Sequence, residues 1–134
     1  MGKRKRGKQT ASPYGRAPSG ELVSFMLGSG RNRAGMVNLE YRVGRERLVT
    51  SFRLSLICFE HNPRDNDRVL GYDTAHNHRY GPCHRHHKDQ AKPVALQDCR
   101  FTEVLARFCK EAMALMQQLD CPRPSEEVWK SACE

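Results

Sequence analysis

The fold is decided by the stretch Met36–Val43, MVNLEYRV, in which apolar and polar residues alternate. Every second residue from Val37 to Val43 is apolar, which is the period of a strand with one buried face. A similar alternation returns in Leu48–Phe59, after the short turn Gly44–Arg47. The two stretches therefore predict an antiparallel hairpin.

Further strand signals flank this hairpin. Glu21–Leu27 predicts a strand before a glycine-rich loop at Gly28–Gly35, and Arg68–Asp73 predicts another after the polar loop His61–Asp67. From Thr74 to Pro93 no clear period is present, because polar residues and a Gly-Pro step interrupt it.

The strongest single element is a helix. Apolar residues recur at helical spacing across Phe101–Leu119, with charged residues between them. Asp98 or Thr102 is expected to cap its start, and Asp120 and the residues after it to end it. We therefore expect an α+β fold: an antiparallel meander of about four or five strands, with one long C-terminal amphipathic helix packed on one face.

The positive charge is concentrated at the N-terminus. The formal net charge is +8, and residues 1–19 carry six basic residues and no acidic one. This segment is also rich in Gly, Ser and Pro, so we expect a disordered basic tail. It is expected either to contact phosphate backbones or only to aid solubility. Residues 20–120 then form a single domain, and residues 121–134 a C-terminal extension.

A second basic group lies within the predicted fold and contains arginine but no lysine. Its members are Arg31, Arg33, Arg42, Arg45, Arg47 and Arg53. Arginine suits paired contacts to phosphate oxygens. The same residues also fit a hairpin face that is simply solvated.

The chain shows no sign of a membrane or export signal. No apolar run is long enough to span a bilayer, and the basic N-terminus is not followed by an apolar stretch. Among the six cysteines, Cys58 falls in a predicted strand and Cys109 on the apolar helix face. We therefore expect all six to be reduced thiols and the protein to be cytoplasmic.

Histidines form the most unusual feature of the sequence. All six lie between His61 and His87. Two His-x-His pairs, His76/His78 and His84/His86, flank a Gly-Pro step. If each pair is extended, its two imidazoles project from the same side of the chain, and a turn between the pairs would bring all four rings together.

One hypothesis is acid–base cleavage of RNA. Attack by a 2′-hydroxyl needs one group to remove a proton and another to protonate the leaving oxygen, and histidine suits both roles near neutral pH. The expected catalytic residues are His76, His84 and His86, with Asp73 orienting an imidazole.

The same hypothesis requires residues that hold the substrate. Arginines stabilise charge on phosphate oxygens, and other polar residues near the histidines can contact the nucleotide. The expected substrate-binding residues are Tyr72, His78, Arg79, Arg85 and Arg53.

Two non-catalytic hypotheses stay open. Neutral imidazole is a common ligand of Zn²⁺, so His76, His78, His84 and His86 form an alternative metal site. Alternatively, the segment binds a protein partner or phosphate groups without any turnover.

The order of these residues resembles the TumE-like proteins, toxins of bacterial toxin–antitoxin pairs. The match consists of Tyr72, Asp73, Ala75, His76, His84 and His86, within a similarity that covers roughly Met36–Leu119. The resemblance implies a growth-inhibiting activity with RNA as the expected target. It also implies neutralisation by a cognate helix-turn-helix antitoxin protein.

Overall fold

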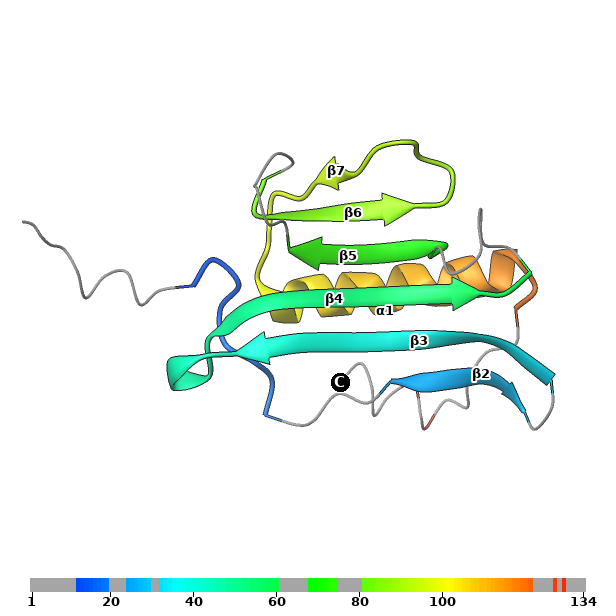
Figure 1. Cartoon of the computed structure of the whole chain (residues 1–134), viewed down its shortest axis with the longest axis horizontal. Coiled ribbons are helices and arrows are strands. Elements are labelled where there is room, and N and C mark those ends of the chain that lie inside the picture. Colours follow the sequence, from blue (N-terminus) through cyan, green and yellow to red (C-terminus); the bar gives the residue numbers. More distant parts are fainter. Residues whose placement is uncertain are drawn as a thin grey trace, which may run out of the picture.

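The computed structural model describes residues 12–19, 24–29, 32–60, 68–74 and 81–121, together with residues 127 and 129. Within these residues, six strands form one antiparallel sheet in chain order (Figure 1). The strands are β2 (Phe25–Ser29), β3 (Asn32–Val43), β4 (Val49–Cys58), β5 (Leu70–Thr74), β6 (Cys83–His87) and β7 (Val94–Ala95). A short 3-10 turn, η2 (Arg45–Arg47), joins β3 to β4, and the helix α1 (Phe101–Gln118) follows β7.

The molecule has two layers. α1 lies across one face of the sheet, behind β4 and β5 in Figure 1, and contacts both strands. This confirms the predicted α+β fold with a C-terminal helix on one face. The described sheet has six strands rather than four or five, because β6 and the very short β7 extend it.

The core lies between the sheet and α1. Strand residues on the helix side alternate with polar ones on the other side, as the hairpin pattern requires. Burying one large apolar side chain contributes about 1.5–3 kcal/mol, so this layer supplies the main driving force for folding. The largest fully buried side chains are Tyr72, Phe101, Phe108, Leu27, Leu54, Leu56, Leu70, Met116, Val37, Val49, Val69 and Val104.

Part of the predicted disordered tail is packed against this core. Tyr14 is only 7% exposed, its ring meets Phe52 edge to face at 5.6 Å, and its hydroxyl donates to the carbonyl of Pro82 over 3.0 Å. The Ser12 hydroxyl donates to the carbonyl of Val49. The prediction of disorder is therefore wrong for residues 12–19, because one aromatic side chain anchors an otherwise polar segment. Residues 1–11 lie outside the described residues.

The start of α1 also differs from expectation. The N-cap residue is Arg100, with no side-chain capping hydrogen bond, so the predicted caps Asp98 and Thr102 are wrong. The first helical N–H, that of Phe101, donates instead to the carbonyl of Tyr14 over 2.7 Å. The N-terminal segment thus satisfies one of the helix donors that a cap would otherwise take.

The first strands are shifted relative to the prediction. β2 begins at Phe25, and β3 begins at Asn32, within the stretch predicted as a glycine-rich loop. Gly35 pairs with Cys58 in the sheet, and a Cβ at this position would collide with the carbonyl of Ile57. The glycine therefore permits a close strand approach rather than a loop. The predicted polar loop His61–Asp67 lies outside the described residues.

The cysteine prediction is wrong for at least three positions. Cys83 and Cys99 form a disulfide with a Cα–Cα distance of 5.8 Å, and Cys109 is disulfide-bonded as well. Folding places the start of β6 beside the segment before α1, which the sequence separation hides. The cytoplasmic location was predicted partly from reduced cysteines, and this support no longer holds. The location itself stays a prediction. In the described part of the chain, no helix has the length and apolar character that crossing a bilayer requires.

Candidate functional site

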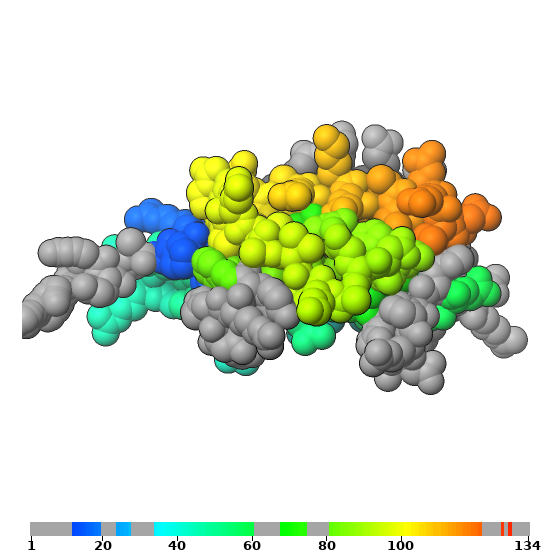
Figure 2. Space-filling view, turned by 90° about the horizontal axis from the view of Figure 1, so that it is seen from above, coloured from blue at the N-terminus to red at the C-terminus, as the bar shows by residue number. Residues whose placement is uncertain are grey.

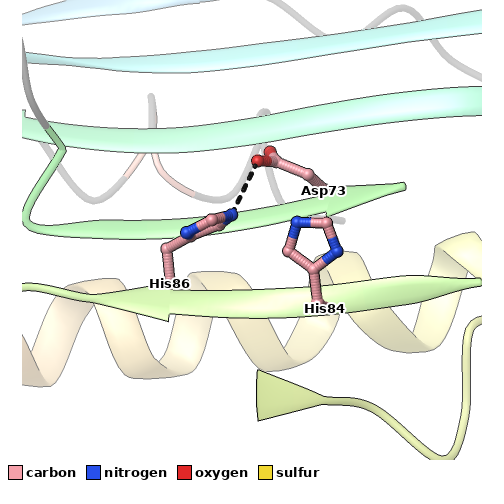
Figure 3. A group of neighbouring side chains, drawn as sticks. All are labelled: Asp73, His84 and His86. Carbon is pink, nitrogen blue, oxygen red and sulfur yellow. Dashed lines mark ion pairs between the residues drawn. The ribbon is translucent and has the colours of Figure 1, made fainter. Parts of the chain in front are cut away.

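The candidate site is built by two neighbouring strands, β5 and β6. Asp73 pairs directly with His84 in their register, and His86 follows two residues later on the same side of β6. Figure 3 shows all three side chains on the face of the sheet turned away from α1, here called the distal face. Side chains alternate along a strand, so this spacing places the two imidazoles side by side.

These three residues, the Asp73–His84–His86 cluster, are in close contact. His86 Nε2 lies 3.3 Å from Asp73 Oδ2. The rings of His84 and His86 meet edge to face with their centroids 4.6 Å apart. The side chain of Asp73 is 14% exposed and that of His86 is 35% exposed. The cluster thus consists of the Asp73 carboxylate, the His86 imidazole in contact with it and the His84 imidazole in contact with His86. All three groups lie together in one partly buried site.

Arg68 holds the carboxylate of the cluster in position. Its Nη1 donates to Asp73 Oδ1 over 2.7 Å and its Nη2 donates to Oδ2 over 2.6 Å, while Nη1 also donates to the Ser55 hydroxyl over 3.3 Å. A Cβ on residue 71 would collide with this guanidinium group, so Gly71 leaves the space that Arg68 occupies. Neither Arg68 nor Gly71 was among the predicted site residues.

The surroundings set the charge states of the cluster. Burial alone would raise the pKa of Asp73, but hydrogen bonds from His86 and Arg68 outweigh it and lower the pKa to about 2. Asp73 is therefore a carboxylate at neutral pH. Burial lowers the pKa of His84, and the neighbouring His86 and Arg68 act in the same direction, which outweighs the opposite effect of the Asp73 carboxylate. His84 therefore favours its neutral form, which accepts a proton or coordinates a metal ion.

A line of polar residues crosses the sheet at this level. The register places Glu40 on β3, Arg53 on β4, Asp73 on β5 and His84 on β6 opposite one another in succession. Arg53 is exposed. Of the predicted site residues, the structure thus brings together Arg53, Asp73, His84 and His86.

Two predicted substrate-binding residues lie on the helix side of the sheet instead. Tyr72 is fully buried, and its hydroxyl donates to a carboxylate oxygen of Glu111 on α1. Arg85 Nε donates to the same carboxylate over 2.8 Å, and its Nη1 donates to Gln90 over 2.9 Å. The strand period separates Tyr72 and Arg85 from the histidines they neighbour in sequence. Their contacts connect β5 and β6 to α1.

This helix-side group is electrostatically tight. Burial, together with the hydrogen bond to Glu111, raises the pKa of Tyr72 to about 12. Burial would raise the pKa of Glu111, but the hydrogen bonds from Arg85 and Tyr72 bring it below its ordinary value. Glu111 is therefore a carboxylate that holds two strands of the site against the helix.

Other predicted residues cannot be placed. His76, His78 and Arg79 lie outside the described residues, so the facing of the two His-x-His pairs stays a prediction. His87 lies on the helix side of β6, and its Nδ1 accepts a hydrogen bond from the Asp89 backbone N–H over 3.1 Å. Of the three histidines in β6, His84 and His86 therefore belong to the cluster, and His87 lies on the other side of the sheet.

The cluster has the composition of a metal site. Asp73, His84 and His86 each offer one ligand atom, and these atoms all lie within 4.8 Å of one another. Two imidazoles and a carboxylate suit Zn²⁺ and related divalent ions, and three protein ligands leave a coordination position for another molecule. Among the described residues, this set contains Asp73 and the predicted pair His84/His86, while His76 and His78 lie outside them.

The cluster lies close to the β7 edge of the sheet. Ala95 of β7 pairs with His84, so β7 flanks the histidine strand. Figure 2 views this edge and shows the chain from β6 to the start of α1, in yellow-green to yellow, lying alongside the helix. The site can bind a metal ion or exchange protons with a bound molecule.

Comparison with known protein families, curated proteins and solved structures finds no match for this chain.

Proposed function

We propose that the protein is an RNA-cleaving enzyme of the toxin type in which His84 and His86 transfer the protons. The observation that carries this proposal is the contact between the two imidazoles, 4.6 Å between centroids, with Asp73 3.3 Å from His86 Nε2. Two imidazoles in contact can serve both ends of one phosphodiester, since base and acid act on oxygens of the same phosphate.

The reaction is an internal transfer at phosphorus. The 2′-hydroxyl of RNA attacks the adjacent phosphorus while one imidazole removes its proton. The bond from phosphorus to the 5′-oxygen breaks, and the other imidazole gives that oxygen a proton. The products are a 2′,3′-cyclic phosphate and a free 5′-hydroxyl, with no net gain or loss of protons.

The environment suggests which histidine plays which part. The lowered pKa of His84 keeps its ring neutral near pH 7, which suits the base. His86 Nε2 lies 3.3 Å from Asp73 Oδ2, so the carboxylate orients this ring, to which we assign the role of the acid. Arg68 keeps this carboxylate fixed and ionised rather than contacting the substrate itself.

Arg53 is the candidate for phosphate contact among the described residues. It is exposed and stands beside Asp73 in the register of β4 and β5. A guanidinium at this place can stabilise the charge that builds on the phosphate oxygens. Arg85 is bound to Glu111 on the other side of the sheet, which weakens its proposed substrate role. Roles for His76, His78 and Arg79 stay predictions.

The toxin assignment rests on the resemblance to TumE-like proteins. That resemblance suggests a cytoplasmic target and a helix-turn-helix antitoxin as partner. The arrangement of Asp73, His84 and His86 supports a shared site among the matching residues, because it brings together three of the six positions that carry the resemblance.

Expression in bacteria tests the proposal. Wild-type protein should arrest growth and degrade cellular RNA, and His84→Ala should do neither. His87→Ala is the matched control, because His87 belongs to the same strand but faces α1, and it should stay toxic. Thermal unfolding of each purified variant confirms that it is folded. Equal growth with and without the wild-type protein, or equal toxicity of folded His84→Ala, rejects the proposal.

A second candidate function is metal binding without catalysis. It is favoured by the three ligand atoms within 4.8 Å of one another. In that case purified protein keeps close to one equivalent of Zn²⁺ after dialysis, and Asp73→Asn or His84→Ala loses it. The protein then cleaves no RNA, so RNA cleavage by purified protein that persists in a strong chelator excludes this alternative.

A further inference from the structure

Two cysteines that take no part in the Cys83–Cys99 disulfide lie together at one end of the core. Cys58 is the last residue of β4, and Cys121 follows α1. Both are buried, with exposures of 0% and 8%. The side chains of Cys58 and Cys121 are hydrogen-bond partners of one another, so the two thiols are neighbours in the core.

The backbone holds this contact in place from both sides. Next to Cys58, the Phe59 N–H donates to the carbonyl of Ala34 over 2.9 Å. The Cys121 N–H donates to the carbonyl of Met116 over 2.8 Å, and Asp120 adopts a left-handed conformation (φ 54°) that turns the chain after the helix. Figure 1 shows this end of α1 beside the end of β4. The fold itself, rather than side-chain flexibility, therefore brings the thiols together.

We propose that Cys58 and Cys121 are a disulfide site, bonded in protein that folds under oxidising conditions. Cys83, Cys99 and Cys109 are already disulfide-bonded, so the fold is compatible with such conditions. This inference does not rest on the proposed nuclease activity, which uses no cysteine.

The reaction is thiol–disulfide exchange with a small disulfide such as oxidised glutathione. The thiolate of one cysteine attacks the glutathione disulfide and releases one glutathione, leaving a mixed disulfide. The second protein thiolate attacks the protein sulfur of that mixed disulfide and releases the second glutathione. Two protein thiols are thereby oxidised, one glutathione disulfide is reduced to two thiols, and the two protein protons pass to the released glutathione.

The timing of this reaction follows from burial. Burial raises the pKa of Cys58 to about 12 and also raises that of Cys121. Thiolate is the reactive form, so both groups react slowly once the core has closed. The bond is therefore expected to form while the protein folds, which decides how the experiment is done.

The bond would complete a pair of clamps on α1. Cys83–Cys99 joins the segment before the helix to β6, and a Cys58–Cys121 bond would join the segment after the helix to β4. Cys99 precedes α1 and Cys121 follows it, so the two cysteine pairs lie at opposite ends of the helix. Both ends of the helix would then be covalently held to the sheet that carries the histidine cluster.

The test is a disulfide map of refolded full-length protein. Reduced, denatured protein is refolded with oxidised glutathione at a concentration that links the Cys83 and Cys99 peptides completely, which serves as the internal control. It is then denatured without reductant, alkylated, digested and analysed by mass spectrometry. We expect a linked Cys58–Cys121 peptide. Alkylation of both Cys58 and Cys121, or a link from either to another cysteine, overturns the proposal.

A single substitution provides a second measurement. In Cys121→Ala, Cys58 should be alkylated after denaturation while the Cys83–Cys99 peptide stays linked. The refolded wild type should also unfold at a temperature about 10 °C above that of the Cys58→Ala/Cys121→Ala variant under the same oxidising conditions. An equal or higher unfolding temperature for the double variant contradicts a bond between these residues.

Discussion

Arg68 and Asp73 form a two-pronged ion pair on the distal face, with Nη1–Oδ1 and Nη2–Oδ2 distances of 2.7 and 2.6 Å. The pair crosses over Gly71, whose missing side chain leaves room for the guanidinium group. Because Asp73 also contacts His86, this ion pair fixes the carboxylate that orients the imidazole. The geometry of the histidine cluster thus depends on Arg68 and Gly71, which no sequence pattern identifies as site residues.

Gly71→Ala should release Arg68 from Asp73. The new methyl group collides with the flexible end of the arginine side chain, so the guanidinium moves while the strand remains. Loss of its two hydrogen bonds should raise the pKa of Asp73 from about 2 toward the ordinary value of 3.8, as NMR titration of the carboxyl carbon will show. Arg68→Met should have the same effect, and the two changes together should add nothing. An unchanged pKa in Gly71→Ala contradicts this account.

The stability that the Asp73 carboxylate contributes should be lost in acid. Its folded pKa, about 2, lies below the ordinary value of 3.8, so the unfolded chain takes up the proton at higher pH than the folded protein. The stabilisation is therefore complete above about pH 5 and is lost as pH falls toward 2, by about 2 kcal/mol in all. Urea unfolding at several pH values measures it. The difference between wild type and Asp73→Asn should shrink across this range, and a constant difference argues against the assignment.

Glu111→Gln should destabilise the contact between the sheet and α1. Glu111 accepts hydrogen bonds from both Tyr72 and Arg85, so removing its charge weakens two bonds and leaves a partly buried guanidinium without its counter-ion. The expected loss is about 2 kcal/mol of unfolding free energy, measured with urea. Glu103→Gln, an exposed position on the same helix, is the control and should cost less than about 0.5 kcal/mol. Similar losses for both would show that the Glu111 contacts contribute little.

Removal of the Cys83–Cys99 disulfide should also destabilise the fold. The bond closes a loop between residues 16 positions apart, and its loss in the Cys83→Ala/Cys99→Ala variant should cost about 3 kcal/mol. Thermal unfolding measures the effect. Unfolding of the wild type in the presence of a reductant should show a shift in the same direction, and no shift in either experiment would contradict a stabilising role.

The parts of the fold that follow one hydrophobic period could be predicted from the sequence. The alternation in Met36–Val43 and the helical spacing in Phe101–Leu119 each bury one apolar face, and both elements occur nearly where expected. β6 could not be predicted because it lies within the stretch from Thr74 to Pro93, where no period exists, and most of its residues are histidine or arginine. It is held in the sheet by its pairing with β5 and β7, and Cys83 is its one fully buried side chain.

The candidate site was only partly predictable for a similar reason. The His-x-His spacing of His84 and His86 correctly places both imidazoles on one side, because alternation is a property of any strand. The same rule places Tyr72 and Arg85 on the helix side of the sheet. They were predicted as site residues because they are next to Asp73, His84 and His86 in the sequence. Arg68 became part of the site through a tertiary contact over Gly71, which no spacing rule reveals.

We propose that His84 and His86 cleave RNA by proton transfer with the 2′-hydroxyl as nucleophile. Two labelled oligonucleotides of one sequence, one all-deoxy and one with a single ribonucleotide, are incubated with purified protein in a strong chelator. We expect a single cut after the ribonucleotide, ending in a 2′,3′-cyclic phosphate. The cleavage rate of folded His84→Ala should be reduced by at least about 100-fold, and the rate of His87→Ala should be unchanged. Equal cutting of the all-deoxy strand, no cutting of either strand, or full activity of His84→Ala would contradict it.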